Sequence, residues 1–422
     1  MNSVAFIANH DSEFKWAGIV SSEFHKNGWD IRFLSPGKSL SITDEQLINC
    51  QITPGDVQLV PAEDLISYIW DFDVVVFITG GPKTESFLYQ AREFFITSGA
   101  QRRPLFVTGF VGINIKALYS AFLQRSSADI VCVNSRRDLA LYSSICDNLG
   151  IDKTRLRLTG LGIVNQTNKD YSQKPIRNIV FADQVAIPRT VLERRILYRF
   201  LADLAASRPD ISLIIKPRHR PGETTGHQGK YPPESFFEEF PTPPNLSIDY
   251  TRLTDQFAQT DLLMTISSTA AFEALAHRIN VAIVGDLGVS EVYGNHIFLG
   301  SNLIRTIDQV ISDDIGIVDS KWINEYLSDA NPVRRIYEEI CSELEIKIRS
   351  NNFELTSSPY FNSRTQFYQH RSIFLFSRPS RLQKVVSKFG LVRGILFYVG
   401  NMILPPIISK PLYKFLKLLR IY

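Results

Sequence analysis

The sequence has few of the residues that stabilise small secreted proteins or bind metals. Only four cysteines occur among 422 residues, and the spacing of Cys50, Cys132, Cys146 and Cys341 fits neither a disulfide framework nor a zinc site. We therefore expect reduced, unreactive cysteines and a cytoplasmic protein. Residues Met1–Ile7 lack the basic segment that opens a secretion signal, which agrees with this location.

Acidic residues are absent from the C-terminal part of the chain. The last one is Glu354, and eleven Lys/Arg residues follow it, so the net charge of +3 combines a body of net charge −8 with a tail of +11. Long apolar runs are missing there too. The longest uncharged stretch, Gly394–Ser409, is shorter than the roughly 20 residues of a membrane-spanning helix and contains two prolines.

What the sequence does contain is the composition of a protein with a hydrophobic core, with 44% hydrophobic and 21% charged residues. Short apolar runs such as Val4–Ala8 and Val74–Thr79 alternate with longer amphipathic segments such as Glu85–Thr97. This alternation is typical of a parallel sheet that is covered by helices on both faces.

A polar segment without periodicity, residues 165–176, interrupts this alternation, which then restarts with a strand at Ile179–Ala182. We therefore predict an α/β protein with two Rossmann-like domains, residues 1–164 and 177–350, which face a central cleft. Residues 364–422 form a third region, for which we predict a basic, aromatic and amphipathic helical tail.

The most informative segment is a Ser-Ser-Thr turn between a predicted strand, Leu262–Ile266, and a predicted helix, Thr269–His277. Ordinary N-capping would need only one such residue. Three hydroxyls (Ser267, Ser268 and Thr269) beside the free N–H groups of a helix start favour a bound phosphate. Glu273, one turn into the helix, supports this interpretation.

A second segment is a basic loop after the predicted strand Leu213–Lys216, and strand C-termini are where open α/β sheets bind ligands. Its cations suit a diphosphate or a carboxylate, although a solvated basic loop is the alternative. The candidate donor-binding or catalytic residues in this segment are Lys216, Arg218, His219, Glu223 and His227.

Other candidates also follow predicted strands. Asp11 is the predicted general base, with Glu13 and His10 as rivals, although Asp11 would also serve as a helix cap. Gly109 lies in one of three glycine loops that lack the dinucleotide-binding pattern, and Asp286 follows a later strand; both are candidates for sugar or base contacts. The sequence offers no metal-binding constellation, so we expect metal-independent chemistry without a cofactor.

The tail combines its cations with aromatic and aliphatic side chains. Residues 371–422 therefore favour binding to an anionic membrane surface. Packing against the acidic body and binding of nucleic acid are the alternatives, and we expect no nucleic acid because long aliphatic runs accompany the aromatics.

Several of these segments occur together in an order that resembles an uncharacterised bacterial family of predicted glycosyltransferases, over about residues 3–305. The segments that carry the resemblance are Asp11-Ser12 with Lys15-Trp16, Arg103–Gly109, Leu158–Leu161, Lys216-x-Arg218, Gly222–His227, Thr265–Ala276, Asp286–Ser290 and Gly300–Leu303.

The second half is also similar to bacterial sialyltransferases and capsule transferases of the two-domain GT-B fold, which hold CMP with a His-Pro and a Ser-Ser motif. His219 and Ser267-Ser268 match these motifs, but Arg220 separates His219 from Pro221. The acidic-acidic-Gly motif that carries the base in those enzymes is absent.

Together with the basic tail, the resemblance leads us to expect an inverting glycosyltransferase at the inner face of the plasma membrane. It would move a sugar, with a CMP-linked acidic sugar as one candidate, from a nucleotide donor to a cell-surface glycan or lipid-linked acceptor. Glu273 would bind the ribose, and His219 would stabilise the leaving nucleotide. A nucleotide-sugar epimerase, a polyol-phosphate transferase and a non-catalytic sugar-binding module are the alternatives.

Overall fold

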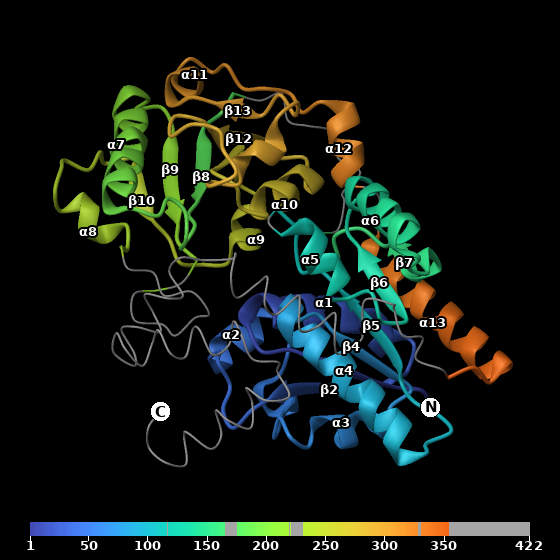
Figure 1. Ribbon diagram of the computed structural model, residues 1–422. Coiled ribbons are helices and arrows are strands. Elements are labelled where there is room, and N and C mark those ends of the chain that lie inside the picture. The colour runs from blue at the N-terminus through green and yellow to red at the C-terminus, as the bar shows by residue number, and fades with distance from the viewer. Residues whose placement is uncertain (116, 165–174, 219, 221–230, 328–330, 354–422) are drawn as a thin grey trace, which may run out of the picture. The chain divides into compact units, whose positions relative to one another are not determined.

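The computed structural model describes residues 1–353, except 116, 165–174, 219, 221–230 and 328–330 (Figure 1). By its contacts the chain divides into two units, Met1–Leu355 and Thr356–Tyr422, and the described residues all belong to the first. They form an α/β fold with two parallel sheets, which confirms the predicted fold class. Most of the predicted linker and the whole predicted tail lie outside the described residues.

The first sheet has seven strands in the described chain, in the order β3-β2-β1-β4-β5-β6-β7, and all neighbours are parallel. Its strands are β1 (Ser3–Ile7), β2 (Asp30–Pro36), β3 (Val57–Val60), β4 (Val74–Phe77), β5 (Leu105–Gly109), β6 (Ile130–Val133) and β7 (Leu156–Leu158). The helices between them are α1 (Asp11–Lys26), α2 (Asp44–Asn49), α3 (Leu65–Tyr68), α4 (Gly81–Ser98), α5 (Leu118–Leu123) and α6 (Arg136–Leu149), with short 3-10 turns η1 (Pro54–Asp56), η2 (Ile69–Asp71) and η3 (Lys153–Arg155).

The second sheet has six described strands in the order β10-β9-β8-β11-β12-β13, again all parallel. They are β8 (Asn178–Ala182), β9 (Ser212–Lys216), β10 (Leu246–Ile248), β11 (Leu262–Thr265), β12 (Asn280–Val284) and β13 (Ile304–Arg305). The helices are α7 (Val191–Ser207), α8 (Glu234–Phe237), α9 (Leu253–Gln256), α10 (Ala270–Ala276), α11 (Ile307–Ile311), α12 (Ser320–Tyr326) and α13 (Pro332–Ser350), with the 3-10 turn η4 (Asn295–Phe298).

Local sequence signals explain where the longer helices begin and end. Ser135 caps α6 by accepting the N–H of Asp138 at 3.0 Å, and Gly150 ends this helix in a left-handed conformation that glycine adopts without strain. Thr190 and Glu193 form a capping box at the start of α7.

The interior strands are buried because both faces of each sheet are covered. In β11, Leu263 packs in the core that contains α10, whereas Leu262 and Met264 pack in the core that contains α7. Alternate residues of a strand point to opposite faces, so a continuous apolar run is what such a strand requires.

Helix α13 follows the second sheet in the chain but packs with the first half. Its residues Ile336, Ile340 and Leu344 share a core with Phe6 and Phe24. The sequence pattern had grouped these helical residues with the second half, in the range 177–350. The domain boundaries at 164 and 177 stay a prediction.

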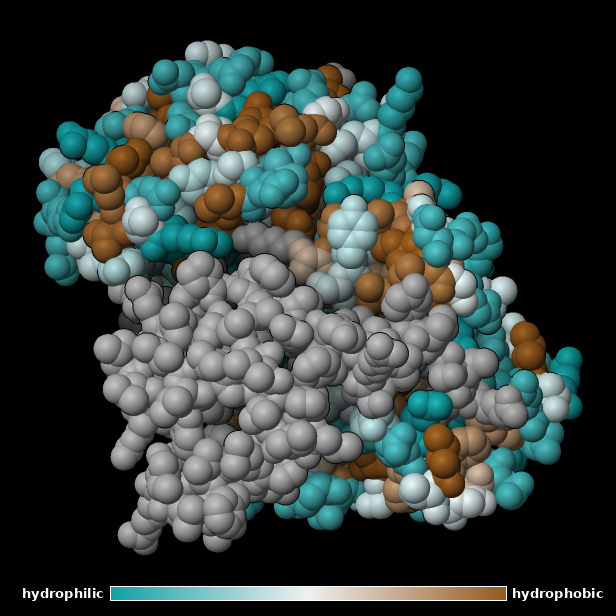
Figure 2. Space-filling view, viewed as in Figure 1, coloured by the Kyte–Doolittle hydropathy of each residue, from teal (hydrophilic) through white to brown (hydrophobic). Residues whose placement is uncertain are grey.

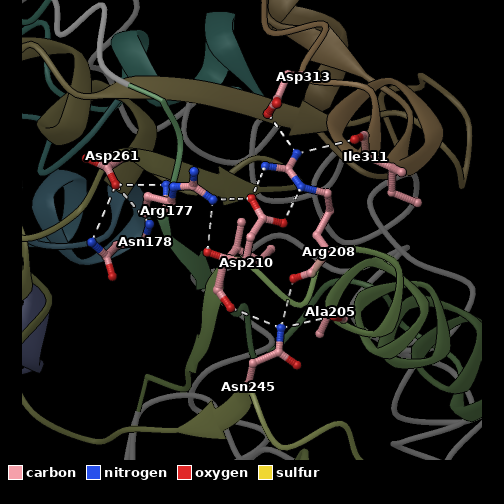
Figure 3. Close-up of polar contacts among 10 residues, drawn as sticks. Arg177, Asn178, Ala205, Arg208, Asp210, Asn245, Asp261, Ile311 and Asp313 are labelled. Atoms are coloured by element: carbon pink, nitrogen blue, oxygen red, sulfur yellow. Dashed lines mark hydrogen bonds and ion pairs between the residues drawn. The ribbon is translucent and has the colours of Figure 1, made fainter.

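At the amino-terminal edge of the second sheet, polar side chains connect the ends of several elements (Figure 3). Arg208 pairs with Asp210 and Asp313 at 2.8 Å each. The side-chain amide of Asn245 donates to the carbonyls of Ala205, Arg208 and Ile211 at 2.9–3.0 Å. These contacts fix the edge that lies away from the carboxyl ends of the strands.

Among the described helices, none combines the length and apolar character needed to cross a bilayer. On the face shown in Figure 2, hydrophobic residues of the second half are interspersed with hydrophilic ones. The four cysteines are free, and burial raises the thiol pKa of Cys50 and Cys132 to about 12, so these two stay protonated at neutral pH.

Candidate active site

A cleft of about 1220 Å³ is lined by residues that follow strands of both sheets. The first half contributes one side of α1, the end of α2 and the loop after β5, and the second half contributes the loops after β8, β9, β10 and β11. Carboxyl ends of parallel strands are where open α/β sheets bind ligands, so the cleft has the position of a binding site.

Two ion pairs join the start of α1 to the second half across this cleft. The Arg218 guanidinium contacts Asp11 Oδ2 through Nη2 at 2.7 Å and Nε at 3.2 Å. One turn further along α1, Lys15 Nζ lies 2.9 and 3.1 Å from the carboxylate oxygens of Glu273. Three residues predicted for binding or catalysis, Asp11, Arg218 and Glu273, are thus brought together, and Lys15 joins them.

The start of α1 separates the three candidate bases. His10 occupies the N-cap position and Asp11 is the first helical residue, so Asp11 is not the cap that the sequence also allowed. Both side chains line the cleft. Glu13 is buried, accepts the N–H of Asn9 at 2.7 Å and that of His10 at 3.3 Å, and is not among the described residues that line the cleft. Burial raises its carboxyl pKa.

The Ser-Ser-Thr turn lies in the cleft between β11 and α10, as the sequence predicted. Its hydroxyls differ in their surroundings. Ser267 donates its hydroxyl to the carbonyl of Tyr293 at 2.6 Å, and Ser268 Oγ accepts the N–H of Ala270 at 3.2 Å. Thr269 faces the first half, because a Cβ added to Gly112 would lie 3.0 Å from Thr269 Oγ1.

The basic loop after β9 contributes Lys216 and Arg218 to the cleft. Lys216 Nζ donates to the carbonyl of Pro217 at 2.7 Å. Arg220 stacks its guanidinium 5.4 Å from the ring centroid of Tyr250. The other candidates from this loop, His219, Glu223 and His227, lie outside the described residues.

Two predicted site residues are not among the described residues that line the cleft. Gly109 ends β5, where a Cβ would lie 2.9 Å from the Cβ and the carbonyl oxygen of Cys132, so strand packing requires glycine there. Asp286 accepts the N–H of Ile307, the first residue of α11, at 3.1 and 3.2 Å. Burial raises the carboxyl pKa of Asp286.

The sequence analysis missed several segments of the cleft, and two of them directly follow strands. Residues 183–187 follow β8 and residues 250–254 follow β10. The first segment reads Asp-Gln-Val-Ala-Ile and lacks the glycines, hydroxyl runs and basic clusters that marked the other loops. Its only signal is its place directly after a predicted strand. The second follows a three-residue strand that the apolar pattern does not reveal.

Within the described residues, no group of three or more His, Cys, Asp or Glu side chains could hold a metal ion. The expectation of metal-independent, cofactor-free chemistry stays a prediction.

The fold is similar to that of several solved structures. The S. aureus MnaA–UDP co-structure matches with a TM-score of 0.55 and 11% identity over 82% of this chain and 98% of that chain. UDP-GlcNAc 2-epimerase from Neisseria meningitidis, bound to UDP-GlcNAc, matches with 0.53 and 11% over 81% and 100%. The Methanocaldococcus jannaschii UDP-GlcNAc 2-epimerase in complex with UDP-GlcNAc and UDP matches with 0.52 and 10% over 81% and 99%. At such identities the likeness shows the fold alone.

No curated protein matches the chain in sequence. A family model does match, over residues 4–340, and its extent agrees with the resemblance seen in the ordered motifs. The chain belongs to the family described as "Putative glycosyltransferase (DUF6716)".

Proposed function

We propose that the protein is a glycosyltransferase that moves a sugar from a nucleotide donor to an acceptor within the cleft. One observation carries the proposal: Asp11 and Lys15 of the first half directly contact Arg218 and Glu273 of the second half. A transfer reaction needs donor and acceptor groups held in one orientation, and two facing halves supply it. Family membership supports the same reaction class.

On the donor side, Lys216 and Arg218 would neutralise the phosphates, and the fork of Arg218 suits bidentate binding. Ser268 and Thr269 would add hydrogen bonds to the phosphate, and Glu273 would accept hydrogen bonds from ribose hydroxyls. His219, which lies outside the described residues, is proposed to stabilise the leaving nucleotide. The similar structures from S. aureus and Methanocaldococcus jannaschii are complexes with UDP or with UDP-GlcNAc and UDP, which supports a nucleotide-sugar ligand.

On the acceptor side, Asp11 is proposed to take the proton from the attacking hydroxyl. Arg218 holds this carboxylate through two contacts to Oδ2. A donor phosphate that binds Arg218 would release Asp11 from this pair, so that donor binding would prepare the base. Asp11→Asn should therefore abolish transfer without weakening nucleotide binding, whereas loss of transfer in His10→Gln but not in Asp11→Asn would identify His10 as the base.

The first experiment is a thermal-shift panel of CMP, CDP, UDP, GDP and ADP on the wild type and Ser268→Ala. We expect at least one nucleotide to raise the melting temperature of the wild type and to do so less in Ser268→Ala. Ser312→Ala, at the exposed end of α11, is the control and should respond like the wild type. If no nucleotide shifts the wild type, the transferase proposal is wrong. A shift with UDP alone would contradict a CMP-linked donor.

An epimerase is the second candidate, because two of the similar structures are UDP-GlcNAc 2-epimerases. It would convert UDP-GlcNAc without an acceptor. We expect no epimer when the protein and UDP-GlcNAc alone are followed by proton NMR, and turnover under these conditions would replace the transferase proposal by the epimerase one.

We also propose that residues 371–422 bind anionic lipid and hold the enzyme at the cytoplasmic membrane face, near a lipid-linked or surface-glycan acceptor. These residues carry a charge of +10 without any acidic residue, which supports this. The intact chain should sediment with anionic liposomes and less with neutral ones, and a chain ending at residue 365 should not. Equal sedimentation of both chains would disprove the lipid role.

A further inference from the structure

The Ser-Ser-Thr turn of the cleft is held by a side chain from a different strand end. Gln184, two residues after β8, accepts the backbone N–H of Ser267 with Oε1 at 2.8 Å. Its Nε2 lies 3.4 Å from Ser267 Oγ. The hydroxyl of Thr265, at the end of β11, lies 3.5 Å from the same Oε1. One carboxamide therefore contacts the strand end and the first residue of the turn.

The loop that carries Gln184 is itself fixed from behind by Arg194 of α7, whose side chain is 3% exposed. Its guanidinium donates to the carbonyls of Gln184, Val185 and Pro188. A buried guanidinium that is engaged with three carbonyls leaves the loop little freedom, since moving the loop would leave buried donors without partners.

The contacts of Ser267 on its other side complete this arrangement. Its hydroxyl donates to the carbonyl of Tyr293 at 2.6 Å, and the phenol of Tyr293 donates to Glu193 of α7 at 2.6 Å. The chain of contacts thus leads from α7 through Gln184 and Ser267 back to α7. Both the N–H and the hydroxyl of Ser267 are used within the protein.

We infer that Gln184 is a positioning residue for the nucleotide site: it sets the Ser-Ser-Thr turn through Ser267, which leaves Ser268 and Thr269 as the turn residues that contact ligand. This inference rests on the proposed function for the nature of the ligand. It changes the role of Ser267, which the sequence assigned to phosphate binding, and it gives a role to a loop that no motif marked.

The test compares Gln184→Met, which keeps the side-chain length but cannot accept the Ser267 N–H, with Asn245→Leu. Asn245 is a matched control, because its side-chain amide also hydrogen-bonds to the backbone, here by donating to three carbonyls at the opposite edge of the sheet (Figure 3). In the ligand-free protein, hydrogen exchange of the Ser267 amide should accelerate at least tenfold in Gln184→Met and stay unchanged in Asn245→Leu. Gln184→Glu, which keeps an acceptor oxygen, should restore most of the protection.

Calorimetric titration with UDP and with CMP gives the second measurement. For whichever nucleotide the wild type binds, Gln184→Met should weaken the affinity about tenfold, whereas Asn245→Leu should not, even where both lower the melting temperature equally. Unchanged exchange at Ser267, or unchanged affinity despite faster exchange, would overturn the inference. If the wild type binds neither nucleotide, the proposed function and the nucleotide role of Gln184 both fail. Unchanged hydrogen exchange at Ser267 would instead refute the contact between Gln184 and Ser267 and leave the proposed function standing.

Discussion

Asp129 shows how a charged side chain can be buried at the amino-terminal edge of the first sheet. Arg103 contacts its two carboxylate oxygens at 2.6 and 2.8 Å, and Lys347 of α13 lies 2.9 Å away. The N–H of Phe106 donates to the same carboxylate at 2.8 Å. Burial alone would raise the carboxyl pKa, but the two cations and the N–H group outweigh it and lower the pKa to about 2.

Removing this charge should be costly. Asp129→Asn leaves two buried cations without their partner, and breaking a buried pair in this way typically costs about 3–5 kcal/mol. Because the folded-state pKa lies below the usual value of 3.8, the stabilisation is present above about pH 4 and is lost as the pH falls toward 2. Urea unfolding of the wild type and Asp129→Asn should thus differ most at neutral pH and converge in acid.

An exposed ion pair provides the control for this experiment. Asp147 pairs with Lys153 at 2.8 Å, with both side chains more than half exposed. Since solvent and salt screen such a pair, Asp147→Asn should unfold at the same urea concentration as the wild type. If both substitutions shift the urea midpoint by the same amount, the burial of Asp129 adds nothing to the stability that its ion pairs provide.

The predictability of single site residues depended on their local sequence. Arg218 and Ser268 could be found because a basic cluster and a hydroxyl run follow apolar strands. Lys15 and Gln184 could not, because what matters about them is a partner far along the chain. Lys15 meets Glu273 and Gln184 meets Ser267, and only the fold brings these pairs together.

At the scale of the element, α1 approaches its neighbour more closely than a side chain would allow. Gly18 lies in the middle of α1, and a Cβ added there would be 1.9 Å from the carbonyl oxygen of Cys50. Alanine is the better helix former by about 1 kcal/mol. Glycine is favoured at this position because the close contact with Cys50 outweighs the helix preference for alanine.

We therefore expect Gly18→Ala to destabilise the protein, by about 1–3 kcal/mol, because the backbones must separate to admit the methyl group. Gly55→Ala is the control, since no atom lies within 4 Å of the added Cβ and its backbone needs no positive φ. Urea unfolding of both variants checks this. An unchanged midpoint for Gly18→Ala would show that α1 and Cys50 separate without cost.

The strands that the sequence failed to predict share one physical property. All three, β3, β10 and β13, lie at the edges of their sheets. An edge strand is paired on one side only and is partly exposed, so it does not need the continuous apolar run that revealed the interior strands. β3, for example, reads Val-Gln-Leu-Val with its two central residues exposed.

For the molecule as a whole, α13 was the element whose partner the sequence could not identify. An amphipathic pattern reveals that a helix has a buried face but not which sheet covers it. The structure shows that α13 packs with the first sheet. The guanidinium of Arg157 in β7 lies 2.9 Å from both Glu339 and Glu343 of α13. The chain thus returns to the first half after completing the second.

The ion pairs across the cleft lead to a prediction about how the two halves hold together. Lys15→Glu should destabilise the described unit, since it places two carboxylates against each other, and adding Glu273→Lys should restore the contact with its charges exchanged. For a partly exposed pair, the interaction free energy is about 1 kcal/mol or less. It should shrink in 1 M salt, because the Debye length is only about 3 Å there. Melting temperatures of the single and double variants at low and high salt measure it. If the double variant is no more stable than the sum of the two single changes predicts, Lys15 and Glu273 do not interact in solution. The ion pair between Asp11 and Arg218 would then be the one of the two that holds the halves together.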